Sequence, residues 1–366
     1  MPGFYSVEVN NKIWVIPDIY RVVEPLGRGS FGQVAKVELR NTKIQAAMKK
    51  LLTPFESEED AKRVYREIKL LKHMNHRNVI SLLDVFHPPS ANANPTWDDF
   101  QEVFLVTELM QKDLHQVIRS IQLSERQVQA ILFQILKGLK YIHSAGVLHR
   151  DLKPGNIAVN ENCELRILDF GMARLLSMDM TERVCTLWYR APEILFGWGS
   201  EYTKAIDMWS VGCILAELIS GRPLFPGTKS DQIKVVIEVM GKPSEEFISG
   251  IRDSFARQYL ERFPPRERMN FREIFPAASP NALDLLEKML EMVPHRRITV
   301  EQALTHPYFE GFSDPYSLDE DTAPLYDQNF ENMNLPINCW KELIMTEIKN
   351  FKPPPCFLGP MRESYG

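Results

Sequence analysis

The sequence predicts an α+β fold in which a small, β-rich lobe is followed by a larger, α-rich lobe. Residues 35–40 alternate between apolar and charged side chains, as in a β-strand, whereas residues 127–143 repeat apolar side chains at helical spacing. A chain of 366 residues is long enough for two close-packed lobes, each with its own core. We therefore expect an N-lobe over residues 1–108, a C-lobe over residues 109–310 and a C-terminal extension over residues 311–366.

Further elements follow in chain order. Ser57 is expected to begin a helix, because Asp60 stands three residues later as the second half of a capping pair. Apolar residues then recur at helical spacing from Ala61 to Leu71. A loop rich in Pro and Asn, residues 87–97, joins two later strands. Long apolar helices are expected to dominate up to about residue 310, and the extension is rich in Pro and Asp.

Composition argues against several classes of function. The formal net charge is −5 and basic residues are not clustered, so neither nucleic acid nor an anionic membrane is an expected partner. The most apolar stretch, residues 208–219, is too short to span a bilayer and is expected to be a buried helix. The five cysteines lie far apart without a C-x-x-C pair, which argues against a disulfide framework or zinc site and favours a reducing compartment. The N-terminus shows no signal-peptide pattern.

A glycine-rich run marks a candidate nucleotide site. It has the pattern G-x-G-x-x-G-x-V, and a predicted strand follows it rather than a helix. The glycines would then form the tip of a hairpin, where residues without a Cβ let the backbone approach phosphates closely. On its own the run also fits a glycine-rich turn that binds nothing. Its residues are Leu26, Gly27, Arg28, Gly29, Ser30, Phe31, Gly32, Gln33 and Val34.

Two downstream residues favour nucleotide binding. Lys49 ends an apolar strand, and Glu67 lies on the next predicted element, the helix that Ser57 begins. A lysine that grips anionic phosphates must be held in place, and a glutamate on a helix can hold it. The alternative is a solvated surface lysine, which fits poorly with the apolar strand around Lys49.

Three further motifs follow in a fixed order. Residues 149–156 are H-R-D-L-K-P-G-N, residues 169–171 are D-F-G and residues 191–193 are A-P-E. Together with the glycine-rich run and Lys49, they match the signature set of protein kinases in order and spacing. From about Tyr20 to about Phe309 the chain therefore resembles the eukaryotic protein kinases, and this resemblance implies their bilobal fold.

The resemblance also implies roles for individual residues. Asp151 would orient the substrate hydroxyl and accept its proton, and Lys153 would neutralise charge on the transferred phosphoryl group. Lys49, held by Glu67, would contact the α- and β-phosphates of ATP. The remaining implied residues are Asn156 and Asp169 as Mg²⁺ ligands, Thr186 in the catalytic set, Thr107 as the gatekeeper before the hinge, Asp113 at the ribose, and Ala47, Met110 and Leu168 around the nucleotide.

The resemblance narrows to one branch of the family. The run W-Y-R-A-P-E at residues 188–193 is typical of the branch that includes the mitogen-activated protein (MAP) kinases. The runs L-L-K-H-M-N-H, Q-I-L-K-G-L-K-Y-I-H-S-A and Y-D-Q-N-F-E resemble the stress-activated p38 group, and the match includes an insert over about residues 241–270 and a tail that wraps onto the small lobe. It implies a monomeric, proline-directed serine/threonine kinase that acts with ATP and Mg²⁺ in stress and immune signalling, in the cytoplasm and nucleus.

The activation segment departs from this family. Its members are switched on by phosphorylation of Thr and Tyr in a T-x-Y motif, whereas here the motif is Thr181-Glu182-Arg183. The family arginine just before the W-Y-R-A-P-E run is Leu187, so the second phosphate site has lost both its acceptor and one partner. Leu187 also borders the pocket for the residue after the target Ser or Thr, which makes the preference for proline less strict.

The partners of the first phosphate remain. Arg150 and Arg174 match the phosphothreonine clamp of the family, and Arg63 and Arg66 on the predicted Glu67 helix can join it. We therefore expect either activation by Thr181 phosphorylation alone or a low, partly constitutive activity.

An acidic cluster follows the last predicted helix of the C-lobe. In the family, acids at this place bind basic docking peptides of MAP kinase kinases, substrates and phosphatases. Charge would speed the encounter with such partners and weaken with salt. Here Tyr316, Ser317 and Leu318 interrupt the cluster, and a solvated acidic loop is the alternative. The implied docking residues are Asp314, Asp319, Glu320 and Asp321, with Glu161 as a supplement.

A function of another class stays open. A pseudokinase scaffold would share the fold and bind partners through the docking groove, but would transfer little phosphate. Arg183 and Leu187 favour a scaffold, whereas the intact catalytic set favours an enzyme. A P-loop ATPase is excluded, because the sequence has no G-x-x-x-x-G-K-[ST] run.

Overall fold

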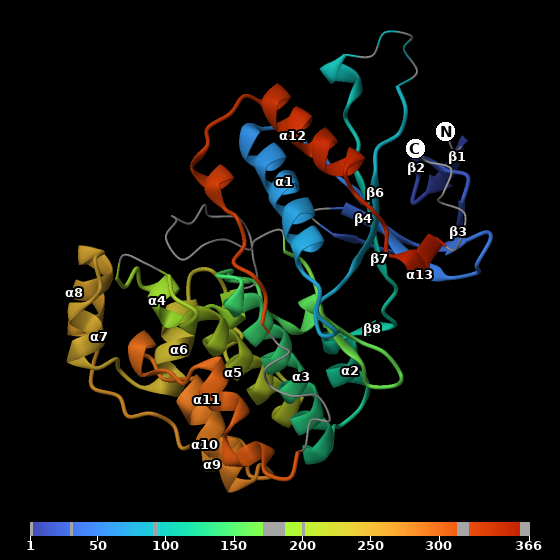
Figure 1. Ribbon diagram of the computed structural model, residues 1–366. Coiled ribbons are helices and arrows are strands. Elements are labelled where there is room, and N and C mark those ends of the chain that lie inside the picture. Colours follow the sequence, from blue (N-terminus) through green and yellow to red (C-terminus); the bar gives the residue numbers. More distant parts are fainter. Residues whose placement is uncertain are drawn as a thin grey trace.

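The computed structural model describes residues 3–29, 32–90, 92, 94, 96–170, 187–199, 202–312 and 322–358. Figure 1 shows a lobe built mainly of strands and a larger lobe built mainly of helices. This arrangement confirms the predicted α+β, bilobal fold class. The last strand of the five-stranded sheet ends at Glu108, and the domain bounds expected from the sequence stay a prediction.

A five-stranded antiparallel sheet forms the core of the small lobe, in the order β3-β4-β5-β7-β6. The predicted alternation in β4 is confirmed, because Ala35, Val37 and Leu39 are buried and form one cluster with Trp14 and Ile16. The hairpin of β1 and β2 therefore covers one face of β4. The strands are β1 (Phe4–Val9), β2 (Lys12–Pro17), β3 (Tyr20–Gly29), β4 (Gly32–Leu39), β5 (Gln45–Leu51), β6 (Leu82–Phe86) and β7 (Phe104–Glu108).

One long helix of the small lobe, α1 (Glu58–His73), begins as the sequence predicts. Ser57 is its N-cap, and the Ser57 Oγ accepts a hydrogen bond from the Asp60 N–H at 3.1 Å. The predicted apolar stripe from Ala61 to Leu71 is buried in the main hydrophobic cluster. In Figure 1, helix α12 (Ile337–Lys349) of the C-terminal extension lies beside α1.

Helices build the large lobe around α3 and α5. The apolar stretch at residues 208–219 lies inside α5, nearly all of it buried, as expected. No helix among the described residues is long and apolar enough to cross a membrane. The helices are α2 (Leu114–Ser120), α3 (Glu125–Ser144), α4 (Pro192–Leu195), α5 (Ala205–Ser220), α6 (Gln232–Met240), α7 (Glu245–Ser249), α8 (Ser254–Arg262), α9 (Phe271–Ile274), α10 (Pro280–Met289) and α11 (Val300–Leu304).

Short elements shape the region between the lobes. A three-stranded sheet joins β8 (Lys112–Asp113), β9 (Ile157–Val159) and β10 (Leu165–Ile167), and the 3₁₀ turn η2 (Pro154–Asn156) precedes β9. Other 3₁₀ turns are η1 (Trp97–Asp99), η3 (Leu187–Tyr189), η4 (Pro294–Arg296) and η5 (Pro307–Phe309). The H-R-D motif at residues 149–151 thus lies just before η2, and Asp169 and Phe170 lie just after β10.

The C-terminal extension returns to the small lobe. It contains η7 (Asn329–Asn332), α12 and the short α13 (Pro355–Leu358). The rings of Phe330 and Trp340 lie 5.0 and 5.7 Å from the ring of Tyr65 on α1, and Phe357 is buried in the same cluster as Trp14. The extension therefore packs on the helix that carries Glu67.

Candidate active site

The predicted phosphate lysine is held as the sequence suggested. The Lys49 Nζ lies 2.7 Å from Glu67 Oε1. Because Ala46 and Met48 point into the core under the hairpin, alternation places Lys49 on the opposite face of the sheet. Burial lowers the pKa of Lys49, but the carboxylates of Glu67 and Asp169 outweigh it and raise that pKa above its ordinary value. A fixed ammonium charge thus stands on the open face of the small lobe.

The catalytic loop brings three predicted residues into one hydrogen-bonded group. Asp151 Oδ2 accepts from the Lys153 Nζ at 2.7 Å and from the Asn156 Nδ2 at 2.9 Å. The same amide nitrogen donates to the Asp151 carbonyl oxygen at 2.8 Å. Since both bonds use the nitrogen of Asn156, its Oδ1 is left to act as a hard oxygen ligand.

The main chain links this loop to the predicted second metal ligand. The Leu168 N–H donates to the Asn156 carbonyl oxygen at 2.8 Å, so Asp169 follows directly on a segment tied to Asn156. Asp169 has a φ of 61°, in the left-handed region that non-glycine residues rarely adopt and that recurs at functional sites. Phe170 is fully buried against the ring of His149, 5.4 Å away, which fixes this turn.

The donor chemistry of Asn156 and Asp169 fits magnesium. Mg²⁺ prefers hard oxygen ligands and is usually bound through one or two carboxylates together with waters and substrate phosphates. Within the described ranges, no three His, Cys, Asp or Glu side chains gather in a way that would hold a metal alone. A magnesium ion here would therefore depend on this pair of residues and on a nucleotide, whose phosphates it would screen.

One residue that holds the catalytic loop was not foreseen. Asp207, in the first turn of α5, is fully buried, and its carboxylate accepts from the N–H groups of His149 and Arg150 at 2.9 and 2.8 Å and lies 2.9 Å from His143 Nε2. Burial alone would raise the pKa of Asp207, but the hydrogen bonds and charge of His143 hold it below its ordinary value. In the sequence, a carboxylate inside the most apolar helix was the signal that could have indicated a buried structural role for Asp207.

Several predicted nucleotide residues share the open face of the sheet. Val34 is opposite Lys49 in the register of β4 and β5, and Ala47 is opposite Thr107 in β5 and β7. All four are partly exposed. At Gly32 a Cβ would lie 2.7 Å from the Lys50 carbonyl oxygen, so this glycine is sterically required.

The other predicted nucleotide residues vary in how they are placed. Leu168 and Met110 are partly buried against the main cluster, whereas Leu26 is half exposed. A Cβ at Gly27 would meet nothing within 4 Å, so space does not require glycine there. Asp113 is the N-cap of α2, and its Oδ1 accepts from the Gln116 N–H at 2.7 Å. Its role at the ribose stays a prediction. Ser30, Phe31 and the side chain of Arg28 lie outside the described residues.

The segment after the predicted activation loop is anchored to the large lobe. The Tyr189 hydroxyl donates to Glu217 Oε2 at 2.6 Å. Glu193 forms two hydrogen bonds with Arg297, at 2.6 and 2.9 Å, and both side chains are buried. This ion pair fixes the A-P-E motif to the loop before α11.

Replacing Glu217 by glutamine is expected to stabilise the protein at neutral pH by about 1 kcal/mol, because burying a charged group is unfavourable while Gln still accepts from Tyr189. Burial raises the pKa of Glu217. The hydrogen bond from Tyr189 and the charges of His115 and Arg119 lower that pKa, but by less. Ionised Glu217 therefore destabilises the fold in full once the pH exceeds this raised pKa. Below the unfolded pKa of 4.5 the carboxyl group is protonated in both states, so this effect is absent. Denaturant unfolding from pH 4 to 8 should show a gain for Glu217→Gln that grows with pH; a gain independent of pH would contradict this account.

Most predicted regulatory and docking residues lie outside the described residues. These are Arg174, Thr181, Asp314, Asp319, Glu320 and Asp321; Arg183 and Thr186, the latter predicted in the catalytic set, also lie outside. Glu161 is exposed between β9 and β10, where its N–H donates to Gln111 Oε1 at 2.8 Å. Arg150 has a φ of 69°, and its guanidinium lies 5.5 Å from the ring centre of Tyr202.

Helical geometry separates the two predicted clamp arginines of α1. Arg63 is one turn before Glu67 and therefore shares its face, toward the active site. Arg66 points to the extension, where its guanidinium forms a bidentate ion pair with Glu331, with 2.8 Å from Nη2 to Oε2. Arg66 is only 2% exposed. Its part in a phosphothreonine clamp stays a prediction that requires this ion pair to open.

Comparison with known proteins agrees with this geometry. A model of the protein kinase domain matches residues 20–309. The chain is 58% identical over 354 residues to Putative mitogen-activated protein kinase 14C of Drosophila melanogaster, which covers 96% of this chain and 98% of that relative. The chain belongs to the mitogen-activated protein kinase family. It is therefore a serine/threonine kinase, as the motifs predicted.

Two more relatives indicate which group of MAP kinases this chain resembles. It is 53% identical over 358 residues to Mitogen-activated protein kinase p38b of Drosophila melanogaster, covering 98% of this chain and 97% of the relative. It is 48% identical over 352 residues to Mitogen-activated protein kinase 13 of Homo sapiens, covering 96% and 94%. The predicted resemblance to the p38 type is thereby confirmed over nearly the full length.

Proposed function

We propose that this MAP kinase transfers the γ-phosphoryl group of ATP to Ser or Thr hydroxyls of protein substrates, preferentially before proline. The supporting observation is the assembled set of Lys49 on Glu67 and Asp151 on Asn156 and Lys153. Lys49 would hold the α- and β-phosphates, and bound Mg²⁺ would neutralise the developing charge. Asp151 would orient the hydroxyl and accept its proton, with Lys153 beside the transferred group.

We further propose that a single phosphate on Thr181 activates the kinase. Arg183 and Leu187 stand where the family has a second acceptor and one of its arginines, whereas Arg150 and Arg63 remain to bind a phosphothreonine. Phosphate carries about two negative charges and orders a loop by bonding to arginines. Arg63 supports this assignment, since it lies on the same face of α1 as Glu67, one helical turn before it.

Thr181→Ala is expected to abolish activation by an upstream MAP kinase kinase, lowering activated kcat/KM by at least about tenfold, because the loop loses its charge-assisted contacts. The measurement is phosphate transfer to a Ser/Thr-Pro protein substrate, before and after treatment with the upstream kinase. Thr203→Ala, an exposed threonine before α5, is the matched control. Full activation of Thr181→Ala would show that this residue is not the switch.

The scaffold alternative makes a different prediction for the same assay. If wild type transfers no more phosphate than a variant without Asp151 under every condition, the kinase acts by binding partners rather than by catalysis. We propose that its partners are MAP kinase kinases, substrates and phosphatases with basic docking peptides, in stress signalling in the cytoplasm and nucleus. The acidic residues from Asp314 to Asp321 support this, because basic peptides need opposing charge.

A further inference from the structure

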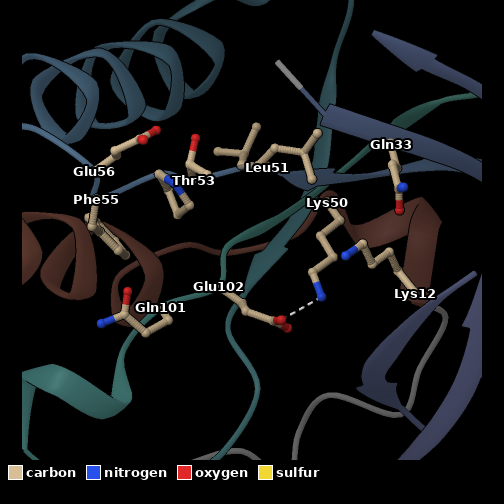
Figure 2. Close-up of a pocket in the computed structure, with 11 residues that line it drawn as sticks. Lys12, Gln33, Lys50, Leu51, Thr53, Phe55, Glu56, Gln101 and Glu102 are labelled. Atoms are coloured by element: carbon tan, nitrogen blue, oxygen red, sulfur yellow. Dashed lines mark hydrogen bonds and ion pairs between the residues drawn. The ribbon is translucent and has the colours of Figure 1, made fainter. Parts of the chain in front are cut away.

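A second pocket lies on the small lobe, outside the proposed nucleotide site. It has a volume of about 410 Å³, in the range of small-molecule sites. Figure 2 shows that its walls come from β2, β4, the end of β5, the loop that leads to α1 and the segment before β7. The lining residues that matter here are Lys12, Gln33, Lys50, Phe55, Glu56 and Glu102.

Gln33 presents a buried donor that has no acceptor. Its side chain is fully buried, and its Oε1 accepts from the Trp14 indole Nε1 at 3.4 Å. An indole N–H can only donate, so this bond fixes which end of the amide is the oxygen. Among the residues that the structure describes, the Gln33 Nε2 then has no hydrogen-bond partner, which is unfavourable for a buried N–H group. Figure 2 shows the Gln33 side chain pointing from β4 toward Lys12 and Lys50.

Two lysines add further donors at the same end of the pocket. The Lys50 Nζ donates to Glu102 Oε1 at 2.5 Å and to the Ile13 carbonyl oxygen at 3.2 Å, which leaves the third N–H of its ammonium group. The side chain of Lys12 is exposed, and it makes no ion pair with any residue that the structure describes. Donors of three side chains thus lie at one end of the pocket, where Glu102 accepts only from Lys50 among the residues that the structure describes.

We propose that this pocket binds a small organic carboxylate with an apolar body. The carboxylate would accept from the Gln33 Nε2 and the Lys12 ammonium, and the body would lie along Leu51, Leu52 and Phe55. The two glutamates of the wall balance the two lysines, so a singly charged group fits better than a doubly charged phosphate. A cationic ligand is disfavoured, since Glu102 is already paired with Lys50.

The pocket lies directly behind the proposed nucleotide site. In the register of β4 and β5, Gln33 is opposite Lys50, and the next pair, Val34 and Lys49, faces the other side of the sheet. A carboxylate on Gln33 would therefore contact β4, the strand that carries Val34 toward the nucleotide on its other face. If a bound nucleotide restricts the motion of β4, the carboxylate loses less entropy on binding, and each ligand tightens the other by the same factor.

The test uses the ¹⁵N-labelled full chain and phenylacetate as the probe. Phenylacetate is expected to shift the Trp14 indole N–H and Gln33 side-chain NH₂ signals to saturation, with a Kd on the order of millimolar. Phenylacetamide, which has the same shape without the charge, should bind at least about fivefold more weakly. Saturating Mg·ADP should tighten phenylacetate binding by about twofold or more.

Variants separate this site from non-specific binding. Lys12→Met and Gln33→Met should each weaken phenylacetate at least about fivefold, whereas Lys234→Met, an exposed lysine on α6, should change nothing. Because Lys12 is exposed, Lys12→Met should fold normally. This variant therefore tests the site even if Gln33→Met, at a buried position, fails to fold. Absence of saturable shifts, or equal affinity in Lys12→Met and wild type, would overturn the proposed site. An unchanged Kd with Mg·ADP would overturn its coupling to the nucleotide.

Discussion

Asp151→Asn is expected to lower kcat for phosphate transfer by about 10²–10⁴-fold, the usual contribution of a general base. An amide oxygen can still accept hydrogen bonds from Lys153 and Asn156, as Asp151 Oδ2 does at 2.7 and 2.9 Å. It cannot take the proton of the substrate hydroxyl. The loss should therefore appear in kcat, with little change in the KM for ATP, because Lys49 and Glu67 are untouched.

The fold should survive this substitution, because asparagine has the same shape and can still accept hydrogen bonds from Lys153 and Asn156. Thermal unfolding of Asp151→Asn should lie close to that of wild type. Asp18→Asn, an exposed aspartate that follows β2, is the matched control and should keep full activity. Equal kcat for wild type and Asp151→Asn would refute the proposed role of Asp151, and it would favour the scaffold alternative.

The contacts within the candidate active site could be predicted from sequence because each motif is local. Asp151 and Asn156 lie five positions apart, so a short loop brings them together whatever the rest of the chain does. The strand alternation around Lys49 also follows from neighbouring residues alone. Lys49 and Glu67 are farther apart, but one strand and one helix connect them, and the pairing follows from their order.

Contacts between distant segments could not be predicted in this way. Asp207 reaches the catalytic loop from α5, and nothing near residue 150 indicates which buried carboxylate its N–H groups bind. Likewise, the donors that face the second pocket come from β2, β4 and β5, which are brought together only by packing of the hairpin on the sheet. Arg66 is the opposite case. Helical periodicity alone indicates that Arg66 lies on another face of α1 than Glu67, so its distance from a phosphothreonine clamp could have been predicted from the sequence.

Glu331→Ala is expected to lower the free energy of unfolding by about 3–5 kcal/mol, the usual consequence of leaving a buried charge unpaired. The extension contacts one face of α1, through Lys62, Arg66, Lys69 and Lys72. Among the ion pairs that the structure describes between the extension and α1, that of Arg66 with Glu331 is the most buried, with side chains 3% and 2% exposed. Without the carboxylate, the guanidinium keeps its charge in an environment that cannot solvate it.

Controls on the same helix face separate burial from charge. Asp327→Ala removes the partner of Lys69, but that aspartate is 65% exposed and 3.4 Å from the ammonium, so the expected loss is below about 1 kcal/mol. Replacing both members of the buried pair, as Arg66→Met with Glu331→Leu, should recover most of the stability lost in Glu331→Ala, because no unpaired charge remains. Denaturant unfolding and hydrogen exchange of α1 measure these effects. If Glu331→Ala unfolds no more easily than Asp327→Ala, the buried pair does not hold the extension on α1. If it unfolds as expected and α1 exchanges faster, the tail controls the helix that positions Glu67 for Lys49.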